Sequence, residues 1–108
     1  MLTTDCEVVT FPRRMIKETC DIHGAQLKTY IAMEEMGELI QALSKQMRGE
    51  GDILNLTEEI GDVMLMMAQM CYIHGINIED VQRSIDYKIV RQAARDLKGK
   101  DVSEHCTA

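Results

Sequence analysis

Apolar residues recur at helical spacing along most of the chain, and no stretch shows the alternation of a β-strand. Residue types that start and stop helices divide this pattern into four segments. We expect Thr10 to cap the first helix, with Pro12 in its opening turn, and this helix to end near His23. The other helices are expected over residues 25–48, from between 52 and 55 to about 74, and from 78 to about 98. The sequence therefore predicts an all-α fold.

A single domain is expected to account for most of the 108 residues. It should span residues 1–98, because Gly99 should end the last helix. Residues 99–108 have no apolar period and should form a flexible C-terminal tail. A domain of this size buries only about two-thirds of the surface that its unfolded chain exposes, so association between copies would add stability.

Charge and cysteine content limit the partners and the compartment. The formal net charge of −6 argues against a nucleic-acid polymer or an anionic membrane as a partner. The longest apolar run, residues 63–73, is shorter than the roughly 20 residues that span a bilayer, and the N-terminus shows no signal pattern. The four cysteines form no Cys-x-x-Cys pair, and no His is spaced to complete a zinc site. We therefore expect a cytoplasmic protein with reduced thiols.

One short phrase occurs twice in the chain, in residues 34–39 and 58–63. Each copy consists of two acids, an apolar residue, a glycine, a third acid and an aliphatic residue. Carboxylates held together in a partly desolvated site repel one another and raise one another's pKa. A divalent cation relieves this repulsion, so the repeat predicts a metal site.

The acids fall on the side of each expected helix that should be buried. At about 100° per residue, Glu35 and Glu38 share a narrow stripe with apolar residues of the second helix. On the third helix, Glu59 aligns with an apolar stripe and Asp62 lies just beside it. The two phrases are symmetric about position 48.5, beside Gly49. An antiparallel turn there would bring the four carboxylates to one level.

The spacing and the residue types suit magnesium. Positions i and i+3 of a helix lie about 5–6 Å apart, so two carboxylates there can hold one ion or bridge two. Mg²⁺ takes oxygen ligands in octahedral geometry and usually keeps water or substrate phosphate at the remaining positions. Gly37 and Gly61, inside the expected helices, predict the close approach of a neighbouring backbone or a ligand. The alternative is a solvated acidic face in which these glycines have no role.

Glu34-Glu35-x-x-Glu38, a gap of 20 residues, and then Glu59-x-x-Asp62 resemble the signature of the MazG-like all-α nucleoside triphosphate pyrophosphohydrolases. The resemblance implies a fold like a four-helix bundle, with the acidic hairpin at its centre. It also implies assembly into a homodimer or homotetramer. The implied reaction is the Mg²⁺-dependent cleavage of a nucleoside triphosphate to its monophosphate and pyrophosphate.

The resemblance covers about residues 25–95 and assigns roles to individual acids. The metal ligands become Glu35, Glu38, Glu59 and Asp62, holding Mg²⁺ or, in its place, Mn²⁺. Glu34 becomes the candidate for orienting or deprotonating the attacking water. The implied substrate is a ribo- or deoxyribonucleoside triphosphate with an ordinary or a modified base.

The last helix departs in part from the family pattern. Family members often carry basic residues, an Asn and an aromatic residue there. This chain keeps the basic positions Lys88, Arg91 and Arg95, which share one helical face, but has Gln92 where Asn is common and lacks the aromatic residue. The three basic side chains either hold the substrate phosphates or form a solvated surface.

A non-catalytic helical interaction module, with the acidic hairpin as a structural cation site, is the alternative to an enzyme. A ferritin-like di-iron protein is set aside because the Glu-x-x-His pairs of that class are absent. Four of the nine methionines lie between positions 64 and 70. They would line a nucleobase pocket or, as we favour, pack in the core or between subunits. Release of pyrophosphate distinguishes the enzyme from the interaction module.

Overall fold

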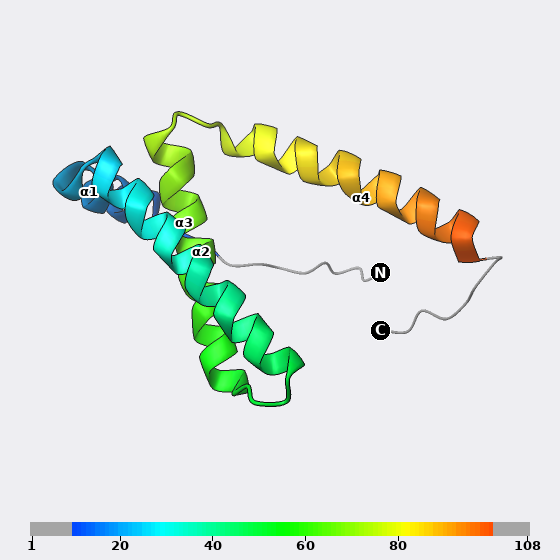
Figure 1. Cartoon of the computed structure of the whole chain (residues 1–108). Helices are drawn as coiled ribbons and strands as arrows, with labels where there is room; N and C mark the ends of the chain where they lie inside the picture. Colours follow the sequence, from blue (N-terminus) through cyan, green and yellow to red (C-terminus); the bar gives the residue numbers. More distant parts are fainter. Residues whose placement is uncertain (1–9, 101–108) are drawn as a thin grey trace. The chain divides into compact units, whose positions relative to one another are not determined.

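A computed structural model describes residues 10–100, with side chains for residues 10–98. Its four helices are α1 (Arg13–His23), α2 (Ala25–Met47), α3 (Ile53–Ile73) and α4 (Ile78–Lys100) (Figure 1). No strand occurs between residues 10 and 100, so the all-α prediction is confirmed. The chain divides after Gly75 into two compact units, the first containing α1 to α3 and the second containing α4.

The first helix begins later than the sequence predicts. Pro12, not Thr10, occupies the N-cap position, with φ −71° and ψ 105° and no hydrogen bond from a capping side chain. The carbonyl of Pro12 accepts hydrogen bonds of 3.0 Å from the amides of Met15 and Ile16. The ring of proline fixes φ near this value and disfavours helical geometry in the residue before it, which explains why α1 cannot extend back to Thr10.

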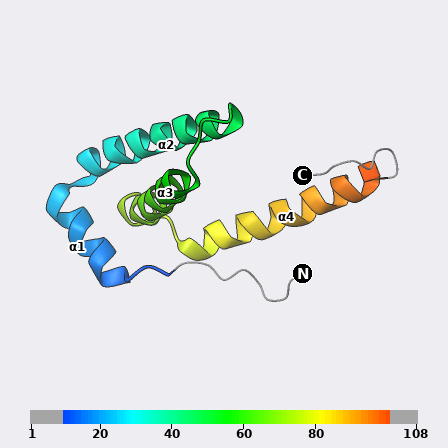
Figure 2. The same cartoon turned by 90° about the horizontal axis from the view of Figure 1, so that it is seen from below.

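The predicted hairpin is formed by α2 and α3, which lie side by side and antiparallel (Figures 1 and 2). The turn contains Gly49 at φ 76°, a conformation that glycine adopts without strain. A Cβ atom on Gly51 would lie 2.8 Å from the Cα of Gln46, so the turn is also too tight for a side chain there. Asp52 then caps α3, because its carboxylate accepts a hydrogen bond of 3.1 Å from the amide of Leu54.

The short helix α1 bends away from α2 at Gly24, where φ is 90°, and packs against the hairpin (Figure 2). The thiol of Cys20 lies 3.9 Å from the carbonyl oxygen of Gln69 on α3. The Tyr72 hydroxyl donates a hydrogen bond of 2.9 Å to Asp21, and Lys17 forms a 2.8 Å ion pair with the same carboxylate. The buried apolar core among the described residues is small: Ile16, Cys20, Ala32, Ala42 and Met66.

The fourth helix forms a unit of its own. Asn77 caps it, since its side-chain oxygen accepts a 2.9 Å hydrogen bond from the amide of Glu79. The helix runs to Lys100, so the expectation that Gly99 ends it is wrong. Glycine stops a helix when it takes a positive φ, as Gly49 and Gly75 do, whereas Gly99 lies inside α4. The rest of the expected tail, residues 101–108, lies outside the described residues.

A helix that spans a bilayer needs roughly 20 predominantly apolar residues. None of the four helices described here is both long and apolar enough to cross a membrane.

Candidate metal centre

Three carboxylates from the two arms of the hairpin converge at one point. Glu35 and Glu38 come from α2, one helical turn apart, and Glu59 comes from the facing side of α3. One carboxylate oxygen from each of the three lies within 4.8 Å of the other two. The antiparallel turn thus brings acids 21 to 24 residues apart in the sequence into a single cluster.

Two of these carboxylates are partly withdrawn from water. Glu35 and Glu59 are half-buried, whereas Glu38 is exposed. The Oε1 atoms of Glu35 and Glu59 are inaccessible to solvent and have no hydrogen-bond partner. A buried, unpaired carboxylate oxygen is costly, because it loses water without gaining a donor. The cluster therefore contains acceptors that its own residues leave unsatisfied.

The electrostatics of the cluster reflect this withdrawal. Burial raises the pKa of Glu35, and the neighbouring charges of Glu38, Asp62 and Glu59 raise it further. The pKa of Glu59 is also raised, first by burial and then by the charges of Glu38, Asp62 and Glu58. Without a cation, the folded hairpin thus resists the ionisation of its central acids.

This donor set fits a divalent cation with a preference for oxygen. The three converging groups are all carboxylates, and Mg²⁺ and Mn²⁺ favour carboxylate and water ligands. A bound cation would give the orphaned oxygens of Glu35 and Glu59 a partner and would oppose the repulsion that raises their pKa. The residues present are therefore suited to hold such an ion.

Asp62 and Glu34 lie at the margin of the cluster. Asp62 is not one of the three residues whose oxygens fall within 4.8 Å of one another, but its charge raises the pKa of both Glu35 and Glu59. Glu34 is exposed on α2, beside Glu35 in the sequence. The structure thus places three of the four predicted ligands together and the fourth close by.

The predicted phosphate-binding residues belong to the second unit. Lys88, Arg91 and Arg95 are exposed on α4 at positions that share one side of the helix. The guanidinium of Arg91 lies 5.4 Å from the ring centroid of Tyr87. The acid cluster is built from α2 and α3 alone, and the role of these three basic residues stays a prediction.

Two polar residues that sequence reasoning missed lie on the inner side of the hairpin. Lys28 and Gln69 are buried, at 9% and 4% exposure, and the Oε1 atom of Gln69 has no partner. Lys28 precedes Glu35 by seven residues, and Gln69 follows Asp62 by seven. Both therefore continue the acid-bearing stripes by two helical turns, a spacing that would have identified them from the sequence.

The helix-interior glycines do not have the close neighbour that the sequence predicts. A Cβ atom on Gly37 or on Gly61 would meet no atom within 4 Å. No neighbouring backbone among the described residues therefore approaches either glycine, and the close approach of a ligand stays a prediction.

A shallow pocket of about 430 Å³ lies at the other end of the hairpin, against α1. It is lined by Cys20, Asp21, Gly24, Ala25, Tyr72 and Ile73. No predicted site residue borders it, so it is separate from the acid cluster.

Comparison with known proteins gives one finding. The family model described as the MazG nucleotide pyrophosphohydrolase domain matches residues 24–95. This span includes α2, α3 and most of α4, and it contains every residue predicted to act in the site. A search of the curated proteins and of the solved structures found no match to the chain.

Proposed function

The chain belongs to the MazG nucleotide pyrophosphohydrolase family, and from this premise we propose that it hydrolyses a nucleoside triphosphate to the monophosphate and pyrophosphate. The observation that carries the proposal is the convergence of Glu35, Glu38 and Glu59, with two carboxylate oxygens that lack any partner. The reaction requires Mg²⁺, for which Mn²⁺ can substitute, held by these three acids together with Asp62.

The bound cation would supply charge that stabilises the leaving pyrophosphate and lowers the pKa of a bound water. The chain's residues then position the reactants. A water oxygen attacks the α-phosphorus, the bond from this phosphorus to the bridging oxygen of the β-phosphate breaks, and the water loses its proton. Glu34, exposed next to Glu35, receives that proton.

Phosphate binding is assigned to Lys88, Arg91 and Arg95. Their positive charges would oppose the net charge of −6, which otherwise repels a triphosphate. No Ser–His or Cys–His pair takes part, so the protein contributes position and electrostatics rather than a covalent intermediate.

We also infer a reducing, cytoplasmic location, in agreement with the free thiols of Cys20 and Cys71.

Pyrophosphate release from a panel of ordinary and modified nucleoside triphosphates, with Mg²⁺ present, tests the proposal. We expect monophosphate and pyrophosphate from at least one substrate. Glu38→Gln and Asp62→Asn should each lower the rate by at least about 100-fold, because each removes a metal-binding charge. Both variants should keep the helical circular dichroism of the wild type.

Glu18→Gln is the matched control. It makes the same chemical change at an exposed acid on α1, 58% accessible and paired with Arg14, and should keep the wild-type rate. If the wild type binds Mg²⁺ but cleaves nothing on the panel, the hydrolase proposal is wrong and the helical interaction module with a structural cation is the better account.

A further inference from the structure

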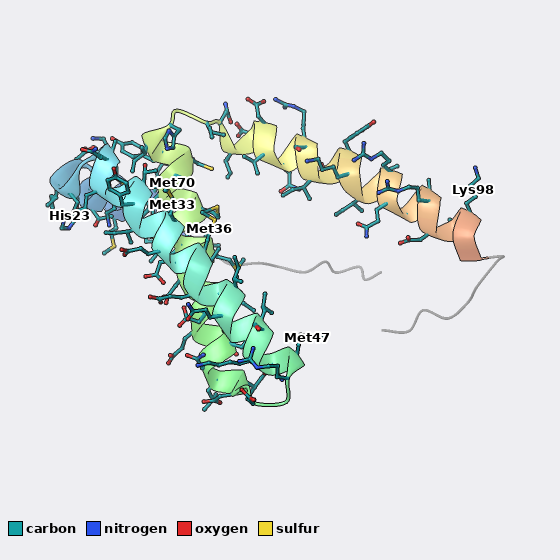
Figure 3. All side chains as sticks on the ribbon, viewed as in Figure 1. His23, Met33, Met36, Met47, Met70 and Lys98 are labelled. Atoms are coloured by element: carbon teal, nitrogen blue, oxygen red, sulfur yellow. The ribbon has the colours of Figure 1, made fainter. Side chains whose placement is uncertain are left out.

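The pocket between α1 and the hairpin lies where α2 begins, with Gly24 and Ala25 in its lining. Figure 3 labels His23, the last residue of α1, and Met47, the last residue of α2, and the pocket is at the His23 end. Ala25 precedes Glu35 by ten residues, which is about 15 Å along the helix. The pocket is therefore a place apart from the acid cluster.

The first turn of α2 carries backbone amides without acceptors. Gly24 is the N-cap and has no side chain to cap the helix, and the first turn contains no acid. The amide of Lys28 donates a hydrogen bond of 3.1 Å to the carbonyl of Gly24. The three amides before it have no acceptor among the described residues: Ala25, Gln26 and Leu27. This turn thus offers three N–H donors and the positive end of the helix dipole beside the pocket.

Lys28 is a second and independent observation at the same place. The residue is only 9% exposed, yet none of the four ion pairs among the described residues includes it. Its ammonium is also absent from the solvent-inaccessible atoms that lack a partner, which belong to Glu35, Glu59 and Gln69. The aliphatic stem of Lys28 is therefore buried, while its unpaired charged end reaches a space that is open to solvent.

That space is the pocket. Side chains of a helix tilt toward its N-terminus, so Lys28 extends back by about one turn, to the level of Gly24 and Ala25. The lining residue Cys20 senses the ammonium: burial raises the pKa of its thiol, and the charge of Lys28 opposes this rise. Across the hairpin, at the level of Lys28, lies the neutral Gln69, so α3 supplies no counter-charge there.

One acid lines the pocket, but its two oxygens are already engaged. Asp21 Oδ2 forms an ion pair of 2.8 Å with Lys17, and Oδ1 accepts a hydrogen bond of 2.9 Å from the Tyr72 hydroxyl. These hydrogen bonds lower the pKa of Asp21 and keep its charge compensated. The charge of Lys28 is left without a partner among the described residues.

We propose that this pocket binds a phosphate group, held by the ammonium of Lys28 and by the free amides of the first turn of α2. A phosphate has more oxygens than a carboxylate and accepts hydrogen bonds from several donors at once, and helix N-termini provide such donors together with a positive potential. The pocket, at about 430 Å³, is larger than the group alone requires. The phosphate can therefore come from free phosphate or from a phosphate monoester such as a nucleoside monophosphate.

Nuclear magnetic resonance of the ¹⁵N-labelled chain tests the proposal directly. The chelated, metal-free protein is used, so that a metal at the acid cluster cannot recruit the phosphate. Inorganic phosphate and uridine monophosphate should shift the amide signals of Ala25 and Gln26 in a saturable manner, and uridine should not. Tighter binding of uridine monophosphate would identify a monoester as the ligand, and equal or weaker binding would identify free phosphate. No saturable shift at these amides with either phosphate compound would overturn the proposal.

A matched pair of lysine variants tests the role of the ammonium. Lys28→Met keeps a buried apolar stem and removes the charge, so it should weaken phosphate binding by at least about 10-fold. Lys45→Met makes the same change at an exposed position of α2 and should bind phosphate as the wild type does. Equal affinities of the two variants would contradict the proposal. If Lys28→Met fails to fold, the titration of the wild type still decides.

The phosphate site and the enzymatic proposal can fail separately. Binding is measured without metal, whereas hydrolysis requires Mg²⁺ at the acid cluster. A chain that releases pyrophosphate but shows no phosphate-dependent shift at Ala25 and Gln26 would refute the phosphate site alone.

Discussion

The two sides of the α2–α3 hairpin are made from the same two helices but differ in what they lack. One side carries the acids of the cluster, where Glu35 and Glu59 hold buried oxygens without a partner. The other carries nine exposed apolar side chains and no charge: Met33, Met36, Ile40, Leu43, Met47, Ile53, Ile60, Met64 and Met67. The first side is short of positive charge and the second of apolar contact. A cation and a second chain would correct the two deficits independently.

Removal of the metal is expected to have the largest effect, and this effect should fall on the acid-bearing side of the hairpin alone. Dialysis against a chelator should lower the rate of pyrophosphate release by at least about 1,000-fold. The cation neutralises charge that develops in the transition state and so lowers its free energy by several kcal/mol. Added Mg²⁺ should restore the rate, and Mn²⁺ should restore part of it. The sedimentation mass should not change during this cycle. A mass that falls with chelation would show that the two sides are coupled.

The contact between the two arms should be the most sensitive to loss of volume. Met66 is 5% exposed, and Met66→Ala should destabilise the fold by about 2–4 kcal/mol because it leaves a cavity. The same truncation at Met15, 62% exposed on α1, should change stability by less than about 0.5 kcal/mol. Urea denaturation of both variants measures the difference. Similar costs at the two positions would contradict the described packing.

The acid side should also give the metal-free protein a characteristic dependence on pH. The pKa values of Glu35 and Glu59 are raised in the folded state, so the folded protein binds more protons than the unfolded chain. Their contribution to stability is full below about pH 4.3, the ordinary pKa of Glu, and is lost as the pH rises through their raised values. Mg²⁺ should reverse this loss because it binds the ionised form.

Thermal unfolding between pH 4 and pH 8, with and without Mg²⁺, measures this dependence. Glu35→Gln should remove part of the slope and raise the stability of the metal-free protein at neutral pH. Glu18→Gln, on α1, should leave the slope unchanged. The change in stability of the wild type between pH 5 and pH 8 should differ with and without Mg²⁺. An equal rise in stability under the two conditions would disprove the repulsion within the cluster.

The smallest effect is expected where α1 meets α3. Tyr72→Phe removes the hydrogen bond to Asp21, which is exposed, so its cost should be well below that of Met66→Ala. The pKa of Asp21 is lowered by its hydrogen bonds to Lys17 and to Tyr72. The contribution of Asp21 to folding stability is therefore present above the ordinary pKa of Asp and is lost as the pH falls through the lowered pKa. The variant should reduce this loss in acid, as measured by denaturation below pH 4.

The sequence was sufficient to predict the helices and the level along the hairpin at which the acids of the two arms meet. Helical periodicity and the symmetry of two phrases about Gly49 predicted the hairpin, because antiparallel helices of constant rise fix which residues face each other. Asp52 and Asn77 were also identifiable, since capping depends on local chemistry. Thr10 is not the cap of α1, because Pro12 disfavours helical geometry in the residue before it and itself occupies the N-cap position.

Features that depend on more than one helix could not be predicted in the same way. The seven-residue spacing from the acids places Lys28 and Gln69 on the acid-bearing stripes, but their burial, at 9% and 4% exposure, is a property of the packed unit. Gly37 and Gly61 have no neighbouring backbone within reach among the described residues, so the sequence pattern alone does not give the reason for these two glycines. The methionines between positions 64 and 70 stand out in the sequence, but which of them are exposed and which are buried, as Met66 is, depends on the geometry of the hairpin.

The central claim is that the cluster of Glu35, Glu38 and Glu59 exists to hold a divalent cation. The most direct test is a crystal of the protein soaked in Mn²⁺, with diffraction data collected where manganese scatters anomalously. We predict an anomalous peak between the three carboxylates, within coordination distance of the buried oxygens of Glu35 and Glu59. Carboxylates turned apart into solvent, with no peak among them, would contradict the account.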